Sequence, residues 1–117
     1  MGFNFEDLDV YNKSIDLVSH IYLLTKTFPK DEMFGLTSQL RRAVVSIPPN
    51  ISEGSARSKK DFSRFIDMAR GSVFECVTLL QISIKQCYVV DEKYVDLKSE
   101  LTDLPEMLSG LKRSINR

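Results

Sequence analysis

The sequence predicts an all-α protein that folds as an antiparallel, up-down-up-down four-helix bundle. Four segments carry apolar residues at alternating intervals of three and four, the spacing that places them on one side of an α-helix. The segments between them are short, and short connections between long helices make consecutive helices antiparallel neighbours. The chain has 117 residues, of which 43% are hydrophobic. A single domain over residues 1–117 can therefore bury a core without disulfides or structural metals.

The first two predicted helices span about residues 7–28 and 36–55. A three-four seam in the first helix is expected to face the core: Leu8, Tyr11, Ile15, Val18, Tyr22 and Thr25. Pro48 and Pro49 interrupt the second helix, because proline lacks a backbone donor and crowds the preceding turn. Since the apolar spacing continues across both prolines, a kink is favoured over an end and a restart.

The last two predicted helices span about residues 59–90 and 92–116. Ser58 should cap the third helix as the first residue of a capping box. Cys76 and Cys87 both fall in this helix, about 16 Å apart along its axis, which is too far for a disulfide. Both are therefore expected to be small buried apolar residues.

Signatures of catalysis and metal binding are absent from the sequence. The only histidine, His20, has no glutamate three residues before it, as di-iron bundles require, and should face solvent. Every arginine follows His20, which excludes the arginine-then-histidine motif of helical-bundle RNases. One histidine and two cysteines cannot build an ordinary zinc site. We expect no catalytic residue, no metal and no cofactor, and hence a protein that is not an enzyme.

The sequence also bears on location. No run of about 18 apolar residues is present, so no membrane span is predicted. The segment from Met1 to Asp9 is acidic and lacks the apolar centre of a secretory signal. The expected location is the cytoplasm.

Positive charge is concentrated in the middle of a chain whose formal net charge is zero. From Arg41 to Arg70 there are seven basic and three acidic residues, a net charge of +4. Basic side chains can bind phosphates and release counterions, so the segment suggests nucleic acid as a partner. The candidate nucleic-acid-binding residues, on the second and third helices, are Arg41, Arg42, Arg57, Lys59, Lys60 and Arg64. An ordinary solvated surface would have the same composition.

A polar stripe runs beside the apolar face of the second helix. At 100° per residue, its members fall within an arc of about 80°: Gln39, Arg42, Ser46, Asn50, Glu53 and Arg57. Polar groups at the edge of a core are often paired with each other or with a neighbouring helix. The stripe is therefore either a hydrogen-bond network that sets helix register or a binding surface.

The third helix carries a second apolar face, which contains Ser72 and has Glu75 at its centre. A helix that is apolar on two sides is either central to its bundle or part of an oligomer contact, and in so small a bundle a contact is favoured. The candidate contact residues are Phe65, Met68, Leu79 and Ile82. Glu75 would need a cationic partner there, Arg41 or Arg42, because an unpaired buried carboxylate is unfavourable.

Several polar residues at fixed spacing resemble a known bacterial family of four-helix bundles. The first matching elements are Phe28-Pro29 with Glu32, then Gly35-Leu36, Gln39 and Arg41-Arg42-Ala43. The remaining elements are Ser46-Ile47-Pro48, Asn50-Ile51, Glu53-Gly54, and Phe65 or Ile66 followed by Ala69, Gly71-Ser72 and Glu75. The family includes proteins encoded within intervening sequences of 23S ribosomal RNA genes. Pro49 departs from the pattern, in which a small polar residue is typical.

The resemblance implies a ring-shaped homo-oligomer, a homopentamer, and nucleic-acid binding, because the family is similar to accessory variability proteins of retroelements. It implies no enzyme activity, and for most members the function is unknown. The first functional hypothesis is a homo-oligomer that binds structured RNA or DNA through the basic residues. The alternative is a protein-protein interaction adaptor with no nucleic-acid role. Phe62 and Phe65 have core spacing, so neither is a good candidate for base stacking.

Overall fold

The computed structural model describes residues 3–117, and within them every regular element is helical. The five α-helices are α1 Asp9–Thr25, α2 Leu36–Val45, α3 Ile47–Ser55, α4 Lys59–Lys85 and α5 Asp91–Ile115. Two short 3-10 helices, η1 Asn4–Asp7 and η2 Lys30–Glu32, precede α1 and α2. No helix in residues 3–117 is long and apolar enough to cross a membrane.

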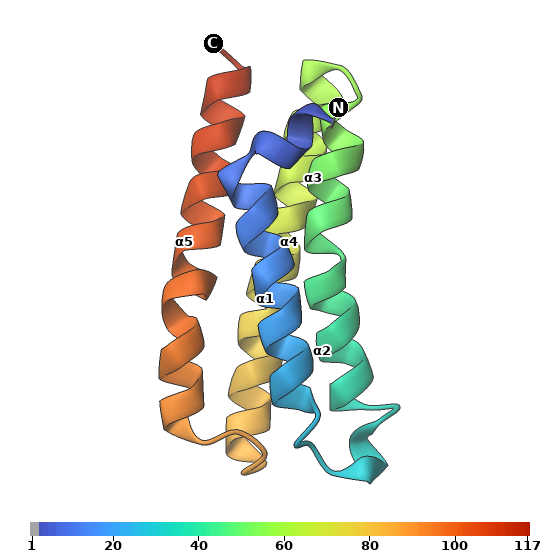
Figure 1. Cartoon of the computed structure of the whole chain (residues 1–117), viewed down its shortest axis with the longest axis vertical. Coiled ribbons are helices and arrows are strands. Elements are labelled where there is room, and N and C mark those ends of the chain that lie inside the picture. The colour runs from blue at the N-terminus through green and yellow to red at the C-terminus, as the bar shows by residue number, and fades with distance from the viewer. Residues whose placement is uncertain (1–2) are drawn as a thin grey trace.

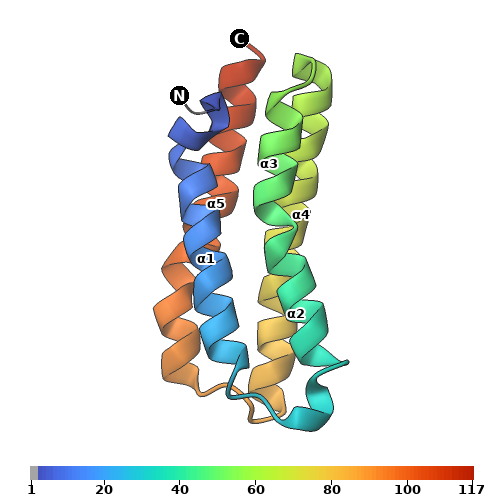
Figure 2. The same cartoon turned by 45° about the vertical axis from the view of Figure 1, so that its right-hand side comes forward.

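The helices form an elongated bundle of 45 × 24 × 22 Å. Figure 1 shows α1 running toward one end of the bundle, α2 and α3 returning together, α4 descending again and α5 leading back to the C-terminus. α2 and α3 follow each other end to end and together take the place of one helix. The five α-helices therefore build a four-helix bundle, whose members are α1, α2 with α3, α4 and α5 (Figure 2). Each member of the bundle packs on the next one in the chain, and α1 also packs on α5. The predicted all-helical bundle is confirmed.

The kink predicted for the second helix lies at Ser46, between α2 and α3. Ser46 keeps helical backbone angles, φ −70° and ψ −17°, and its N–H donates to the Arg42 carbonyl at 3.2 Å. Pro48 and Pro49 follow after Ile47 and cannot donate backbone hydrogen bonds to the turn before them. The apolar face nevertheless stays buried on both sides of the kink, as the continuous spacing predicted.

The core face of α1 differs from the prediction. Ile15 and Tyr22, expected to be buried, are among the exposed large apolar residues, whereas Val10, Leu17 and Ile21 are buried. The true core face is offset from the predicted seam because two overlapping sets of residues share the three-four spacing. The buried set contains a polar member, which obscures it in the sequence: the Ser14 hydroxyl is buried and donates to the Tyr11 carbonyl at 2.6 Å.

The end of α4 also differs from the prediction, because the helix stops at Lys85 and does not continue to Val90. Cys87 takes a left-handed conformation with φ 64°. Its N–H donates to Ile84 and the Tyr88 N–H donates to Ser83, both at 2.9 Å, which is the Schellman arrangement that closes a helix C-terminus. Cys87 is consequently exposed, which corrects its expected burial.

The two thiols should therefore react very differently. Cys76 is buried in the core, and desolvation, with a smaller contribution from the negative charge of Glu75, raises the pKa of Cys76 to about 12. At neutral pH an aromatic disulfide reagent should modify one thiol per chain in the native protein and a second thiol only after unfolding. A Cys87→Ser protein should lose the fast reaction, and two fast thiols in the native protein would contradict the burial of Cys76.

Candidate nucleic-acid interface

The structure divides the six predicted phosphate-binding residues into two groups. Arg41 and Arg42 lie on α2, whereas Arg57, Lys59, Lys60 and Arg64 surround the turn between α3 and α4. Arg57 is fifteen positions after Arg42, a separation on the order of 22 Å along a helix axis. Figure 2 shows that the α3–α4 turn lies at one end of the bundle and the start of α2 at the other. The predicted single patch is thus two surfaces, and the group at the turn is called the turn cations below.

The turn cations are all exposed. Within residues 3–117, Arg64 is the one of them that forms an ion pair, with Asp61 at 3.3 Å. The guanidinium carbons of Arg57 and Arg64 lie 5.2 and 5.6 Å from the centre of the Phe65 ring, within the range of a cation–π contact. The Phe65 ring therefore holds two of the cations at the surface of the turn.

Lys59 and Lys60 are the first two residues of α4, directly after the N-cap Ser58. The Ser58 hydroxyl accepts from the Asp61 N–H at 3.2 Å, as predicted for the cap. A helix N-terminus carries a partial positive charge, so acidic residues stabilise it and lysines do not. Two exposed lysines at this position make the end of the bundle more positive than its fold requires, and residues that break a local rule in this way tend to serve function.

Gly54 lets α3 and α4 approach closely beneath the turn cations. A Cβ atom added to Gly54 would lie 2.7 Å from the Phe65 Cβ and 2.9 Å from the Phe62 Cδ1. Phe65 is half-buried in this contact within the chain. The structure thus gives Phe65, a predicted oligomer contact, a packing role inside its own chain.

The two α2 arginines differ in their freedom to bind a ligand. The Arg41 Nε donates to the Thr25 hydroxyl at 2.9 Å, and its guanidinium carbon lies 4.6 Å from the centre of the Tyr22 ring. Arg42 is exposed and forms no ion pair within the described chain. Neither arginine pairs with Glu75, which is exposed and needs no buried partner, so that expectation was wrong.

The polar stripe separates into a network and an exposed part. The Ser46 and Ser72 hydroxyls lie 2.6 Å apart, and the Asn50 side-chain amide donates to the Ser46 carbonyl at 2.8 Å. This network joins the α2–α3 kink to α4. Ser46 and Asn50 thus agree with the first interpretation of the stripe, a hydrogen-bond network between helices. Gln39 and Glu53 are instead exposed, like Arg42 and Arg57.

The outer face of α4 is apolar at Met68 and Ile82, which are 51% and 42% exposed. Leu79 was expected on this face, but it is 6% exposed and belongs to the core. One large apolar residue of α4 beyond the predicted face is also exposed: Phe74 is 50% exposed, and the Arg70 guanidinium lies 5.7 Å from its ring centre. Sequence spacing did not select Phe74 because three of the four residues at helical spacing from it, Arg70, Gly71 and Thr78, are not large apolar residues.

Comparison with known proteins identifies the family. Residues 6–110 match the family model described as 23S rRNA-intervening sequence protein. The chain belongs to this family. It is also similar to a crystal structure of a protein of unknown function from the S23 ribosomal protein family of Bacteroides thetaiotaomicron, with 25% identity and a TM-score of 0.81 over 88% of this chain and 97% of that one. No curated protein matches. The resemblance predicted from the motifs is confirmed.

Some of the motif residues of this family have a structural role in this chain. Glu32 holds the α1–α2 connection: one carboxylate oxygen accepts from the Leu36 N–H at 3.2 Å, and the other accepts from the Tyr88 hydroxyl at 2.9 Å. This hydrogen bond to Glu32 is the main reason that the pKa of Tyr88 is raised. The Phe28 ring packs 5.7 Å from the Tyr88 ring, centre to centre. These contacts join two connections at the same end of the bundle.

Proposed function

We propose that this chain is a non-enzymatic, cytoplasmic, homo-oligomeric bundle that binds structured nucleic acid through the turn cations. The observation that carries the proposal is the pair of exposed, unpaired lysines at the N-terminus of α4, Lys59 and Lys60. They add to the positive end of the helix dipole and, within residues 3–117, lack a compensating ion pair. Phosphate oxygens complement both the lysines and the helix end. The family description refers to 23S rRNA, which makes structured RNA the first ligand to test.

Assembly would strengthen a weak site. Met68 and Ile82 are exposed apolar residues on the outer face of α4, and burial of their side chains between copies is favourable. In a ring of copies, proposed to be a pentamer, several sets of turn cations would engage one nucleic acid together. Linked sites of this kind raise the overall affinity by orders of magnitude without a new contact.

The test is a double charge reversal, Lys59→Glu with Lys60→Glu. Glutamate at a helix N-terminus is favourable, so the variant should stay folded while its affinity for a structured RNA falls at least tenfold at low salt. Arg64 stays unchanged because it pairs with Asp61. The matched control is Lys93→Glu with Lys98→Glu, which changes net charge equally at exposed positions of α5.

Affinity measured by fluorescence anisotropy separates the outcomes. A site-specific loss in the Lys59 and Lys60 variant supports the proposal. Equal losses in both double variants would show that net charge alone governs binding, and unchanged affinity in the first would show that the turn cations are not the site.

A protein-binding adaptor is the second candidate. The exposed apolar residues of α4, Met68, Phe74 and Ile82, favour it because they could dock a protein partner. Binding by such a surface would depend weakly on salt, and a complex isolated from cells would survive nuclease treatment. The nucleic-acid proposal requires the opposite on both points.

A further inference from the structure

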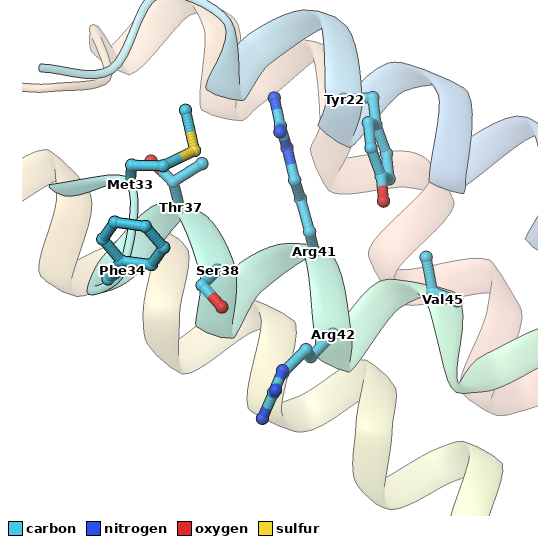
Figure 3. A pocket seen from close by; sticks show the side chains of 8 residues that line it. All are labelled: Tyr22, Met33, Phe34, Thr37, Ser38, Arg41, Arg42 and Val45. Carbon is cyan, nitrogen blue, oxygen red and sulfur yellow. The ribbon is translucent and has the colours of Figure 1, made fainter. Parts of the chain in front are cut away.

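The most exposed aromatic residue among those described lies beside the α2 arginines, away from the turn cations. Phe34, just before α2, is 97% exposed, and its neighbour Met33 is 47% exposed. Both line a surface pocket together with Tyr22, Thr37, Ser38, Arg41, Arg42 and Val45. Figure 3 shows Arg41 pointing toward α1 and Tyr22, while Arg42 points away from α1.

The backbone around Phe34 is held in place by its neighbours. The Met33 N–H donates to the Lys30 carbonyl at 3.1 Å, and the Gly35 N–H donates to the Glu32 carbonyl at 2.9 Å. The Glu32 carboxylate also binds the first residue of α2 and the Tyr88 hydroxyl. The turn therefore presents the Phe34 ring to solvent from a fixed backbone, which lowers the conformational entropy that a ligand must overcome.

The charges of the residues that line the pocket indicate what kind of ligand it would bind. None of the eight residues that line the pocket is acidic, and two are arginines. Arg42 is exposed and, in residues 3–117, has no ion-pair partner, so its guanidinium is free to bind a phosphate. An exposed aromatic face beside a free arginine is the combination that binds unpaired bases and their phosphates. Phe62 and Phe65 cannot serve in this way, because they pack around Gly54.

We infer that this pocket binds an unpaired nucleotide of the nucleic acid, with the base stacked on Phe34 and a phosphate on Arg42. This inference rests on the proposed function and deepens it. It assigns the turn cations to the backbone of the nucleic acid and the Phe34 pocket to single-stranded positions such as loops and ends. A duplex has no free base face and cannot fill the pocket.

The chain has no tryptophan, so a Phe34→Trp protein carries one fluorescent reporter at the pocket. Titration with a short single-stranded oligouridylate should quench this fluorescence, and an RNA duplex of equal length should not. Phe34→Ala should weaken oligouridylate binding about tenfold, the effect typical of one lost base stack. The control pair is Phe3→Trp and Phe3→Ala, at an exposed phenylalanine near the acidic Glu6 and Asp7, where neither effect is expected.

The outcomes separate the inference from the proposed function. If the protein binds RNA with a steep salt dependence, but the Phe34→Trp protein is not quenched and Phe34→Ala binds normally, the inference fails and the proposed function stands. If the unmodified protein binds no RNA, both fail. A lower native mass for Phe34→Ala would assign the ring to a contact between copies, and loss of a protein partner alone would assign it to an adaptor surface. Either result would overturn the inference.

Discussion

A Gly54→Val protein should lose about 3 kcal/mol of its free energy of unfolding, since overpacking a tight helix contact has effects of this size. The Cβ of any residue at this position would lie 2.7 Å from the Phe65 Cβ, which cannot move without moving the backbone of α4. α3 and α4 would have to separate, and the Phe65 ring beneath Arg57 and Arg64 would shift with them. Urea denaturation followed by circular dichroism measures the loss.

Gly71 provides the matched control in α4. An added Cβ at Gly71 would meet no atom within 4 Å. Gly71→Ala should therefore raise the free energy of unfolding by about 0.5–1 kcal/mol, the difference in helix propensity between the two residues. If Gly54→Val were as stable as the unmodified protein, the close approach of α3 to α4 would be wrong.

A Leu79→Glu protein should be unfolded or severely destabilised, by about 4 kcal/mol, because it places an unpaired carboxylate in the core. Leu79 is 6% exposed and lies within the cluster of buried apolar residues. The sequence had suggested a different result, a folded protein of lower native mass, because Leu79 shares helical spacing with the exposed residues of α4. Circular dichroism and light scattering distinguish the two results.

Ile82→Glu is the companion variant, because Ile82 is 42% exposed on the same helix. Its fold should keep its stability within about 0.5 kcal/mol, as is usual for surface substitutions. If the α4 face joins copies, the native mass should fall. A folded Leu79→Glu protein of reduced native mass would instead show that Leu79 lies in the contact between copies and not in the core.

Residues whose environment is set by local helix geometry were predictable from the sequence. The apolar side of α2 and α3, from Leu40 through Ile47 to Gly54, is buried as expected, because its spacing is unambiguous across the prolines. In α1 two overlapping sets satisfied the same spacing, and the buried Ser14 concealed the correct one. Only the neighbouring helices decide which set faces inward.

Features that depend on the packing of distant segments were not predictable. Cys87 closes α4 in a left-handed conformation where glycine is the usual signal, so the sequence predicted a longer helix. The six cations fall within one net-positive segment of the chain, yet α2 and α3 separate Arg41 and Arg42 from the turn cations by on the order of 22 Å. Phe34 could have been suspected as an aromatic residue in a connection, but its exposure required the structure.

The most direct test of the proposed function is the salt dependence of binding between the assembled protein and a structured RNA. The logarithm of the association constant should fall linearly with the logarithm of salt concentration, with a slope of about −0.7 to −0.9 for each phosphate neutralised. Charge reversal of Lys59 and Lys60 should make this slope less steep by about 1.5 for each engaged copy. Binding that is insensitive to salt, or no binding at any salt by an oligomer of verified mass, would contradict nucleic-acid recognition and favour a protein partner.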